Sequence, residues 1–288
     1  MINMKTYDLK DCFDVYKETV ERKRDKVSKT ELQNIENSVK KCYNEYKTHF
    51  NNNDLECLAP AKVGQAHKGV LLDLFNSQNK IVQDFRKRFF EINKQTYNNL
   101  CPYCVINSSN TTDHILPKEE YPEFAINVLN LIPCCGNCNG VKGKRVVNDK
   151  NERLFLNFYT DNLPNVQFLF LNIFNSADGK INFNYRIENI NNVIDSQLFG
   201  LIERHFSNLG LLKEYDIKAI QQFEEITNLY IAQSFTSEQD FDKFARNNLN
   251  AWKNDIKSYG INHWKQVLNN ACATSPIFKQ NIMDKLRV

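Results

Sequence analysis

Long apolar runs are missing from this 288-residue sequence. No stretch is long enough to cross a bilayer as a helix, and the opening MINMKTYDLKDCF lacks the apolar segment of a signal peptide. Gly/Ser-rich and Pro-rich linkers are missing as well, and no internal repeat is visible. These absences argue against a membrane partner or export. They predict a cytoplasmic protein with one large domain or two small ones.

Charge of one sign is not in large excess either. The 37 Lys and Arg residues against 34 Asp and Glu residues leave a net charge of only +3. A field that attracts polyanions over the whole surface is therefore absent, and any contact with nucleic acid depends on local basic patches. One such patch, Arg86–Arg88, is predicted either on a solvated helix face or in contact with phosphate groups.

Cysteine, by contrast, is present nine times. Four of these residues form two Cys-x-x-Cys pairs, Cys101/Cys104 and Cys135/Cys138, which strongly indicate a tetrahedral structural zinc site. Cys134 is a competing ligand, but the spacing favours Cys135. Metal ligation in place of disulfides indicates a reducing compartment, again the cytoplasm. The remaining thiols are scattered and predicted to be buried or idle: Cys12, Cys42, Cys57 and Cys272.

A second set of chemically useful side chains lies between and just after the two pairs. Asp113 and His114 are adjacent, Asn130 follows, and Asn139 comes directly after the last cysteine. Zinc with four cysteine ligands has no open coordination position, so any catalysis belongs to this second set. Asp and Asn oxygens suit Mg²⁺ or Mn²⁺, and a neutral histidine accepts a proton from water near pH 7.

Residues 101–145 resemble the HNH endonuclease family, whose fold is the ββα-metal nuclease fold. The resemblance rests on order: Asp-His before Ile-Leu-Pro, then Asn130-Leu131, then Cys-x-x-Cys-Asn leading into a helix that bears Lys142. The third motif position is Asn139, so the motif is a His-Asn-Asn variant. This resemblance implies metal-dependent hydrolysis of phosphodiester bonds in nucleic acid, with catalytic Mg²⁺ or Mn²⁺ beside a structural zinc.

The resemblance also assigns a role to each motif residue. His114 is the expected general base, and Asp113 and Asn139 are the expected metal ligands. Because adjacent strand residues point to opposite sides, Asp113 is expected to face the metal and His114 the water from the other side. Asn130 is expected to hold the hairpin loop and orient His114 without binding metal. Three basic residues are expected to meet phosphate oxygens or to form a solvated helix end: Lys142, Lys144 and Arg145.

A softer resemblance points to a biological setting. Tyr121-Pro122-Glu123-Phe124, Asn130-Leu131-Ile132-Pro133 and the segment 260–278 are similar to stretches in the HNH subunit (PtuB-like) of Septu and retron-linked antiphage systems. Those subunits work with an ATPase partner. The resemblance implies the effector of a bacterial defence system that acts together with an ATPase.

The expected fold class is α+β. A ββα-metal core with the four-cysteine zinc site and a small antiparallel sheet is flanked by helices, in three regions: 1–97 helical, 98–190 motif and sheet, 191–288 helical. The periodicity predicts helices over 8–50, with Ser28 capping the second, and over 67–97. Strands are predicted over 154–158, 166–174 and 180–187, with a turn at Asp178-Gly179 and the sheet against the motif.

Other functions fit the same pattern. The alternative outside the enzyme class is a zinc module that binds nucleic acid or docks a partner without cutting. The N-terminal helices are predicted to form either a docking surface for a partner protein or a solvated layer over the core. A homing-type or restriction-type nuclease is the alternative within it. The family resemblance favours DNA over RNA or tRNA as substrate, but no residue pattern here decides between them.

Overall fold

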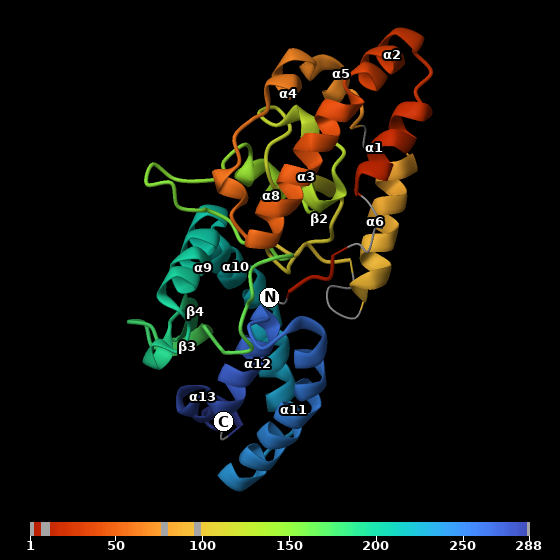
Figure 1. Ribbon diagram of the computed structural model, residues 1–288. Coiled ribbons are helices and arrows are strands. Elements are labelled where there is room, and N and C mark those ends of the chain that lie inside the picture. Colours follow the sequence, from red (N-terminus) through yellow and green to blue (C-terminus); the bar gives the residue numbers. More distant parts are fainter. Residues whose placement is uncertain (1–2, 7–11, 76–79, 95–98, 287–288) are drawn as a thin grey trace. The chain divides into compact units, whose positions relative to one another are not determined.

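A computed structural model describes residues 3–6, 12–75, 80–94 and 99–286, without the side chains of 252–258. The architecture is mixed α+β and mostly helical, with two separate two-stranded antiparallel sheets (Figure 1). Among the described residues, no helix combines the length and the apolar character needed to cross a membrane. The chain divides into two compact units, which we call the motif unit (Asn3–Leu163) and the helical unit (from Pro164 onward).

This division groups the chain differently from the three predicted regions. The N-terminal helices belong with the motif in one unit, and the 166–187 hairpin belongs with the C-terminal helices in the other. Within its own unit this hairpin packs on helices. The predicted strand at 154–158 is absent, and the pairing beside it is a single isolated bridge between Val147 and Arg153.

The helices that open the motif unit range from 5 to 17 residues. They are α1 (Cys12–Glu21), α2 (Lys26–Asn34), α3 (Glu36–Asn52), α4 (Lys62–Ala66), α5 (Lys68–Leu72) and α6 (Lys80–Ile92). The cap of α2 is Asp25, whose carboxylate accepts from the Val27 and Ser28 amides, so the prediction of Ser28 was wrong. The predicted single helix over 67–97 breaks after α5, and part of that range lies outside the described residues.

The motif itself contributes two four-residue strands and a seven-residue helix. Strand β1 (Thr111–His114) pairs antiparallel with β2 (Leu131–Cys134), in a register that places Asp113 opposite Ile132. Helix α8 (Gly136–Lys142) follows at once and packs on β1. Cys135 caps α8 by accepting from the Cys138 amide at 3.4 Å, and Gly143 ends it with φ 56°.

The N-terminal helices brace this small hairpin (Figure 1). Tyr46 of α3 packs its ring 4.8 Å from that of Phe124. The buried carboxylate of Glu123 accepts from the Ala61 amide at 2.8 Å, and a Cβ on Gly64 would collide with it. The Tyr-Pro-Glu-Phe stretch is therefore a joint between the helices and the motif, where only glycine leaves room for the glutamate.

Arg86 has a structural position in α6. Its guanidinium donates to the carbonyl oxygens of Ser109 and Thr111 and to the hydroxyl of Thr112 at 3.0 Å. These contacts hold the start of β1 against α6. Arg86 is therefore half-buried and does not lie on a solvated face, which corrects one predicted setting; contact of this residue with phosphate stays a prediction.

The helical unit contains the second hairpin and five helices. Strands β3 (Leu169–Asn175) and β4 (Ile181–Ile187) pair antiparallel, and Gly179 turns between them with φ 78°, as predicted. The helices are α9 (Ser196–Leu209), α10 (Leu211–Ile231), α11 (Glu238–Tyr259), α12 (Trp264–Thr274) and α13 (Pro276–Leu286). Helices α10, α12 and α13 pack on the hairpin. The ring of Tyr230 lies 5.1 Å from that of Phe241 and 5.3 Å from that of Phe278, in the aromatic core of this unit.

Buried Asn262 connects the start of β3 to the stretch before α12. Its side-chain oxygen accepts from the amides of Phe168 at 2.8 Å and Leu169 at 3.0 Å. Its side-chain nitrogen donates to the Val166 carbonyl at 2.8 Å. Within the segment 260–278, Asn262 therefore has a structural role, because it supports the backbone of the helical unit.

Candidate metal and catalytic site

Four cysteine sulfurs converge at the base of the motif. The Sγ atoms of Cys101, Cys104, Cys135 and Cys138 all lie within 4.8 Å of one another, and all four residues are buried. Tetrahedral zinc with 2.3 Å bonds separates its sulfur ligands by about 3.8 Å, and the Cys104 and Cys135 sulfurs are 3.9 Å apart. This cluster is compatible with zinc and confirms the choice of Cys135 over Cys134, which is not part of it.

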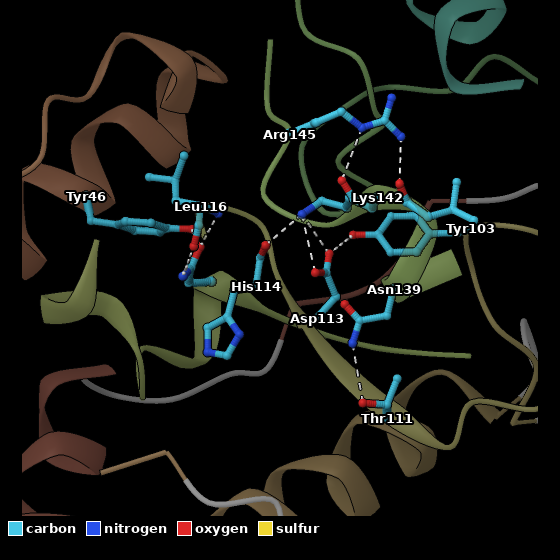
Figure 2. A network of polar contacts seen from close by, with 11 residues as sticks. Tyr46, Tyr103, Thr111, Asp113, His114, Leu116, Asn139, Lys142 and Arg145 are labelled. Atoms are coloured by element: carbon cyan, nitrogen blue, oxygen red, sulfur yellow. Dashed lines mark hydrogen bonds and ion pairs between the residues drawn. The ribbon is translucent and has the colours of Figure 1, made fainter. Parts of the chain in front are cut away.

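Asp113 is buried in strand β1. Its side chain is 4% exposed. The Tyr103 hydroxyl donates to Oδ2 at 2.7 Å, and the Lys142 ammonium lies 3.0 Å from Oδ2 and 3.3 Å from Oδ1 (Figure 2). The carboxylate is thus charge-paired and hydrogen-bonded, as a buried charge requires.

Lys142 lies elsewhere than the sequence predicts. It is 3% exposed, and its ammonium also donates to the His114 carbonyl oxygen at 2.9 Å. Direct contact of Lys142 with a phosphate group is therefore closed off in this structure. The prediction assumed a solvated helix end, but the last turn of α8 faces β1.

The other two basic candidates are exposed. Lys144 and Arg145 follow Gly143, which has a positive φ and lies outside α8. The Arg145 guanidinium donates to the Val141 carbonyl at 2.6 Å and to the Lys142 carbonyl at 3.4 Å (Figure 2). These contacts fix the guanidinium beside the end of α8, in a position open to solvent.

His114 has surroundings of its own. Its ring lies on the opposite side of β1 from the Asp113 carboxylate (Figure 2), 4.5 Å from the Phe75 ring. Nε2 is 2.9 Å from the Ala125 carbonyl oxygen. A carbonyl can only accept, so Nε2 carries the proton and Nδ1 carries the lone pair. Burial lowers the pKa of His114 to about 4, so the ring is a neutral imidazole at pH 7.

Asn130 holds the chain that returns from β1. It is 0% exposed. Its side-chain oxygen accepts from the Leu116 amide at 2.8 Å and from the Tyr46 hydroxyl at 3.2 Å. Its side-chain nitrogen donates to the Leu116 carbonyl at 3.0 Å and the Phe124 carbonyl at 3.3 Å. All of its side-chain contacts are thus with protein groups of the loop and α3.

Asn139 lies beside Asp113 (Figure 2). Its side-chain nitrogen is 3.4 Å from the Thr111 hydroxyl, which leaves its amide oxygen for another partner. One carboxylate and one amide oxygen, completed by water and phosphate, form a donor set that fits Mg²⁺ or Mn²⁺. The structure therefore brings Asp113, Asn139 and Lys142 together, while the ring of His114 faces Phe75 and Ala125.

Two contributors to this site were not found from the sequence. Tyr103 stands inside the first Cys-x-x-Cys pair, and that position was a usable signal, because a residue between two zinc ligands is held rigidly. Phe75 is 39 residues before His114, and no sequence pattern connects the two.

Comparison with known proteins gives partial similarities. No family model matches the chain, and no solved structure matches it. Protein ea31 of Escherichia phage lambda is 25% identical over 198 residues, which is 63% of this chain and 64% of ea31. Septu protein PtuB of Bacillus thuringiensis is 32% identical over 84 residues, which is 24% of this chain and 33% of PtuB. The chain therefore spans less than two thirds of the length of each relative.

Proposed function

We propose that this chain is a metal-dependent endonuclease of the HNH type that hydrolyses phosphodiester bonds in nucleic acid, with DNA favoured over RNA. The observation that carries the proposal is the placement of Asp113 and Asn139 side by side at the junction of β1 and α8. The four-cysteine cluster next to them supports a rigid site. The partial similarity to PtuB supports the same assignment.

In this proposal each residue has a separate task. Asp113 and Asn139 hold the divalent cation, which supplies charge neutralisation at the phosphate and at the leaving oxygen. His114 takes the proton of the attacking water on Nδ1, because Nε2 is committed to the Ala125 carbonyl. Asn130 keeps the loop in place so that the Ala125 carbonyl stays within reach of His114. Lys144 and Arg145 bind the nucleic-acid backbone.

The wider setting is also part of the proposal. We assign the chain to a bacterial antiphage defence system, as an effector that acts with an ATPase partner. The name of the second relative and the Tyr-Pro-Glu-Phe stretch support this setting. Affinity purification of the chain from its host should recover an ATPase. Recovery of the chain alone, fully active by itself, would contradict the partner.

A zinc module that binds nucleic acid without cutting is the second candidate. Two observations favour it: the Asp113 carboxylate is already paired with Lys142, and His114 is 6% exposed beneath Phe75. Catalysis requires both groups to become accessible to metal or water. A pure binding module has no such requirement.

Cleavage assays separate the two candidates. Plasmid DNA and total tRNA are incubated with the zinc-loaded chain and Mg²⁺, Mn²⁺ or EDTA. We expect metal-dependent cleavage that falls by roughly 10²- to 10⁴-fold in His114→Ala, because a general base contributes about that much. His49→Ala is the matched control, since His49 lies in the same unit and pairs with Asp54 instead. Binding without cleavage by the wild type would favour the zinc module.

A further inference from the structure

The two side chains that hold the Asp113 carboxylate share an origin. Tyr103 stands between the cluster cysteines Cys101 and Cys104. Lys142 ends helix α8, whose N-cap and first turn carry the other two cluster cysteines. Both Cys-x-x-Cys pairs therefore reach the same carboxylate, each through one side chain of its own segment.

Tyr103 is buried in a position that directs its hydroxyl to Asp113. The ring is 1% exposed, and its hydroxyl is 2.7 Å from Oδ2 of Asp113. A phenol hydroxyl facing a carboxylate can only donate, so the Tyr103 hydroxyl is the donor of this bond. Because the flanking cysteines fix the Tyr103 backbone, the hydroxyl can direct the carboxylate only if the cluster is assembled.

Lys142 acts on the same carboxylate with a full charge. Its ammonium lies within 3.3 Å of both Asp113 oxygens and donates to the His114 carbonyl. A divalent cation that binds Asp113 takes a place beside this ammonium, and like charges at such a distance repel each other. Tyr103 therefore favours a carboxylate ready for metal, and Lys142 opposes tight metal binding.

We infer that Tyr103 and Lys142 are positioning residues through which the four-cysteine cluster sets the orientation and the metal affinity of Asp113. The inference rests on the proposed role of Asp113 as a ligand of the divalent cation. It adds two residues with opposite effects to the site, and it gives the structural zinc a functional output beyond stability.

The test is Mn²⁺ binding by the zinc-loaded full chain, followed by the paramagnetic resonance signal of free Mn²⁺. Tyr103→Phe should raise the Mn²⁺ dissociation constant about tenfold, because the charge-assisted hydrogen bond that orients Asp113 is lost. Lys142→Met, which keeps an unbranched chain, should lower it by about tenfold or more, because the repulsion is removed. Zinc content should stay at the wild-type value in both.

Tyr159→Phe is the matched control. The Tyr159 hydroxyl lies in the same unit and donates to the Leu131 carbonyl at 2.8 Å, so its loss also removes one hydrogen bond from the half-buried interior. Tyr159 does not touch Asp113, so the Mn²⁺ affinity of Tyr159→Phe should equal that of the wild type. A shift of the same size in Tyr103→Phe and Tyr159→Phe would overturn the inference, since the effect would then be general destabilisation.

The remaining outcomes separate this inference from the proposed nuclease. Mn²⁺ affinities that change in opposite directions, with no cleavage by any variant, would leave the inference standing and remove the nuclease. A wild type that binds no Mn²⁺, or a Tyr103→Phe variant with wild-type affinity, would overturn the inference, whatever the chain cuts. If Lys142→Met does not fold, the Tyr103→Phe and Tyr159→Phe pair decides.

Discussion

The motif unit and the helical unit are held together by different means. The motif unit builds its site from two four-residue strands and a seven-residue helix, which is too little regular structure to be stable alone. The helical unit has helices of 11 to 22 residues around an aromatic core. Among its described residues no group of three or more potential metal-ligating side chains converges. The motif unit therefore combines a packed aromatic core with a cysteine cluster that is compatible with zinc, whereas the helical unit relies on packing.

This difference shows why the candidate site is located where it is. A cluster of four cysteines fixes short segments rigidly without a large core. Side chains such as Asp113 and Tyr103 can then be buried and exactly partnered close to the surface of a small hairpin. A packed helical core offers stability but no such local rigidity in irregular chain.

Loss of zinc should have the largest effect, and only on the motif unit. Cys135→Ser removes one ligand, and structural zinc contributes on the order of 10 kcal/mol to folding. We expect amide hydrogen exchange to become fast over Asn3–Leu163 and to stay slow in the helical unit. Cys57→Ser, at an exposed thiol outside the cluster, is the control. Retained zinc and protection in Cys135→Ser would contradict the four-cysteine assignment.

Truncation of a core side chain in the helical unit should have the opposite effect, with faster hydrogen exchange in that unit only. Tyr230→Ala removes a fully buried ring that contacts Phe241 and Phe278, at a cost of about 3 to 5 kcal/mol. Hydrogen exchange should accelerate in α10, α11 and α13, while zinc content stays at the wild-type value. Zinc loss in this variant would show that the two units fold as one.

Acidification should weaken both units, but the motif unit more. Burial lowers the pKa of His114 to about 4 and that of His263 to about 3, below the ordinary 6.5. The unfolded chain then binds protons that the folded chain does not, so stability falls as pH drops below about 6.5. The His114 shift alone corresponds to about 3 kcal/mol by pH 4.

Cysteine ligands also take up protons in acid, which adds to the loss in the motif unit. Exchange protection in each unit between pH 7 and pH 4 measures the difference. His263→Gln should flatten the pH dependence of the helical unit and leave that of the motif unit unchanged. An equal flattening in both units would contradict separate titration.

Two buried asparagines, one in each unit, offer the finest comparison. Asn130 supports the backbone at Leu116 and Phe124 in one unit, and Asn262 supports Val166–Leu169 in the other. Substitution of either by Ala leaves buried backbone groups without partners, which costs about 2 kcal/mol. In zinc-free protein the Asn130→Ala effect should vanish, while the Asn262→Ala effect should persist. Persistence of both would show that the loop of the motif unit survives without the cluster.

Local patterns in the sequence predicted part of this structure correctly. The Cys-x-x-Cys spacing identified the four clustered thiols, and alternation with Asp178-Gly179 identified the β3–β4 hairpin. Both depend on residues close together in the chain. The prediction of a strand at 154–158 was wrong, because aromatic composition alone does not supply a neighbouring strand to pair with.

The environments of single residues could not be predicted in this way. Lys142 and Arg86 were expected at the surface on composition, yet one pairs with Asp113 and the other holds β1. Phe75 against His114 depends on the path of the chain between α5 and β1. Such contacts join segments tens of residues apart, and no local pattern contains them.

The sequence by itself determined which four cysteines cluster, the α+β class and the order of the motif residues, because spacing and periodicity are properties of the chain. Tertiary structure alone decided which charges are buried, which ring nitrogen of His114 carries the proton and which side chains contact Asp113. The physical reason is that burial and pairing depend on what each group meets after folding. A lysine at the end of a helix is solvated or buried according to the face that packing covers.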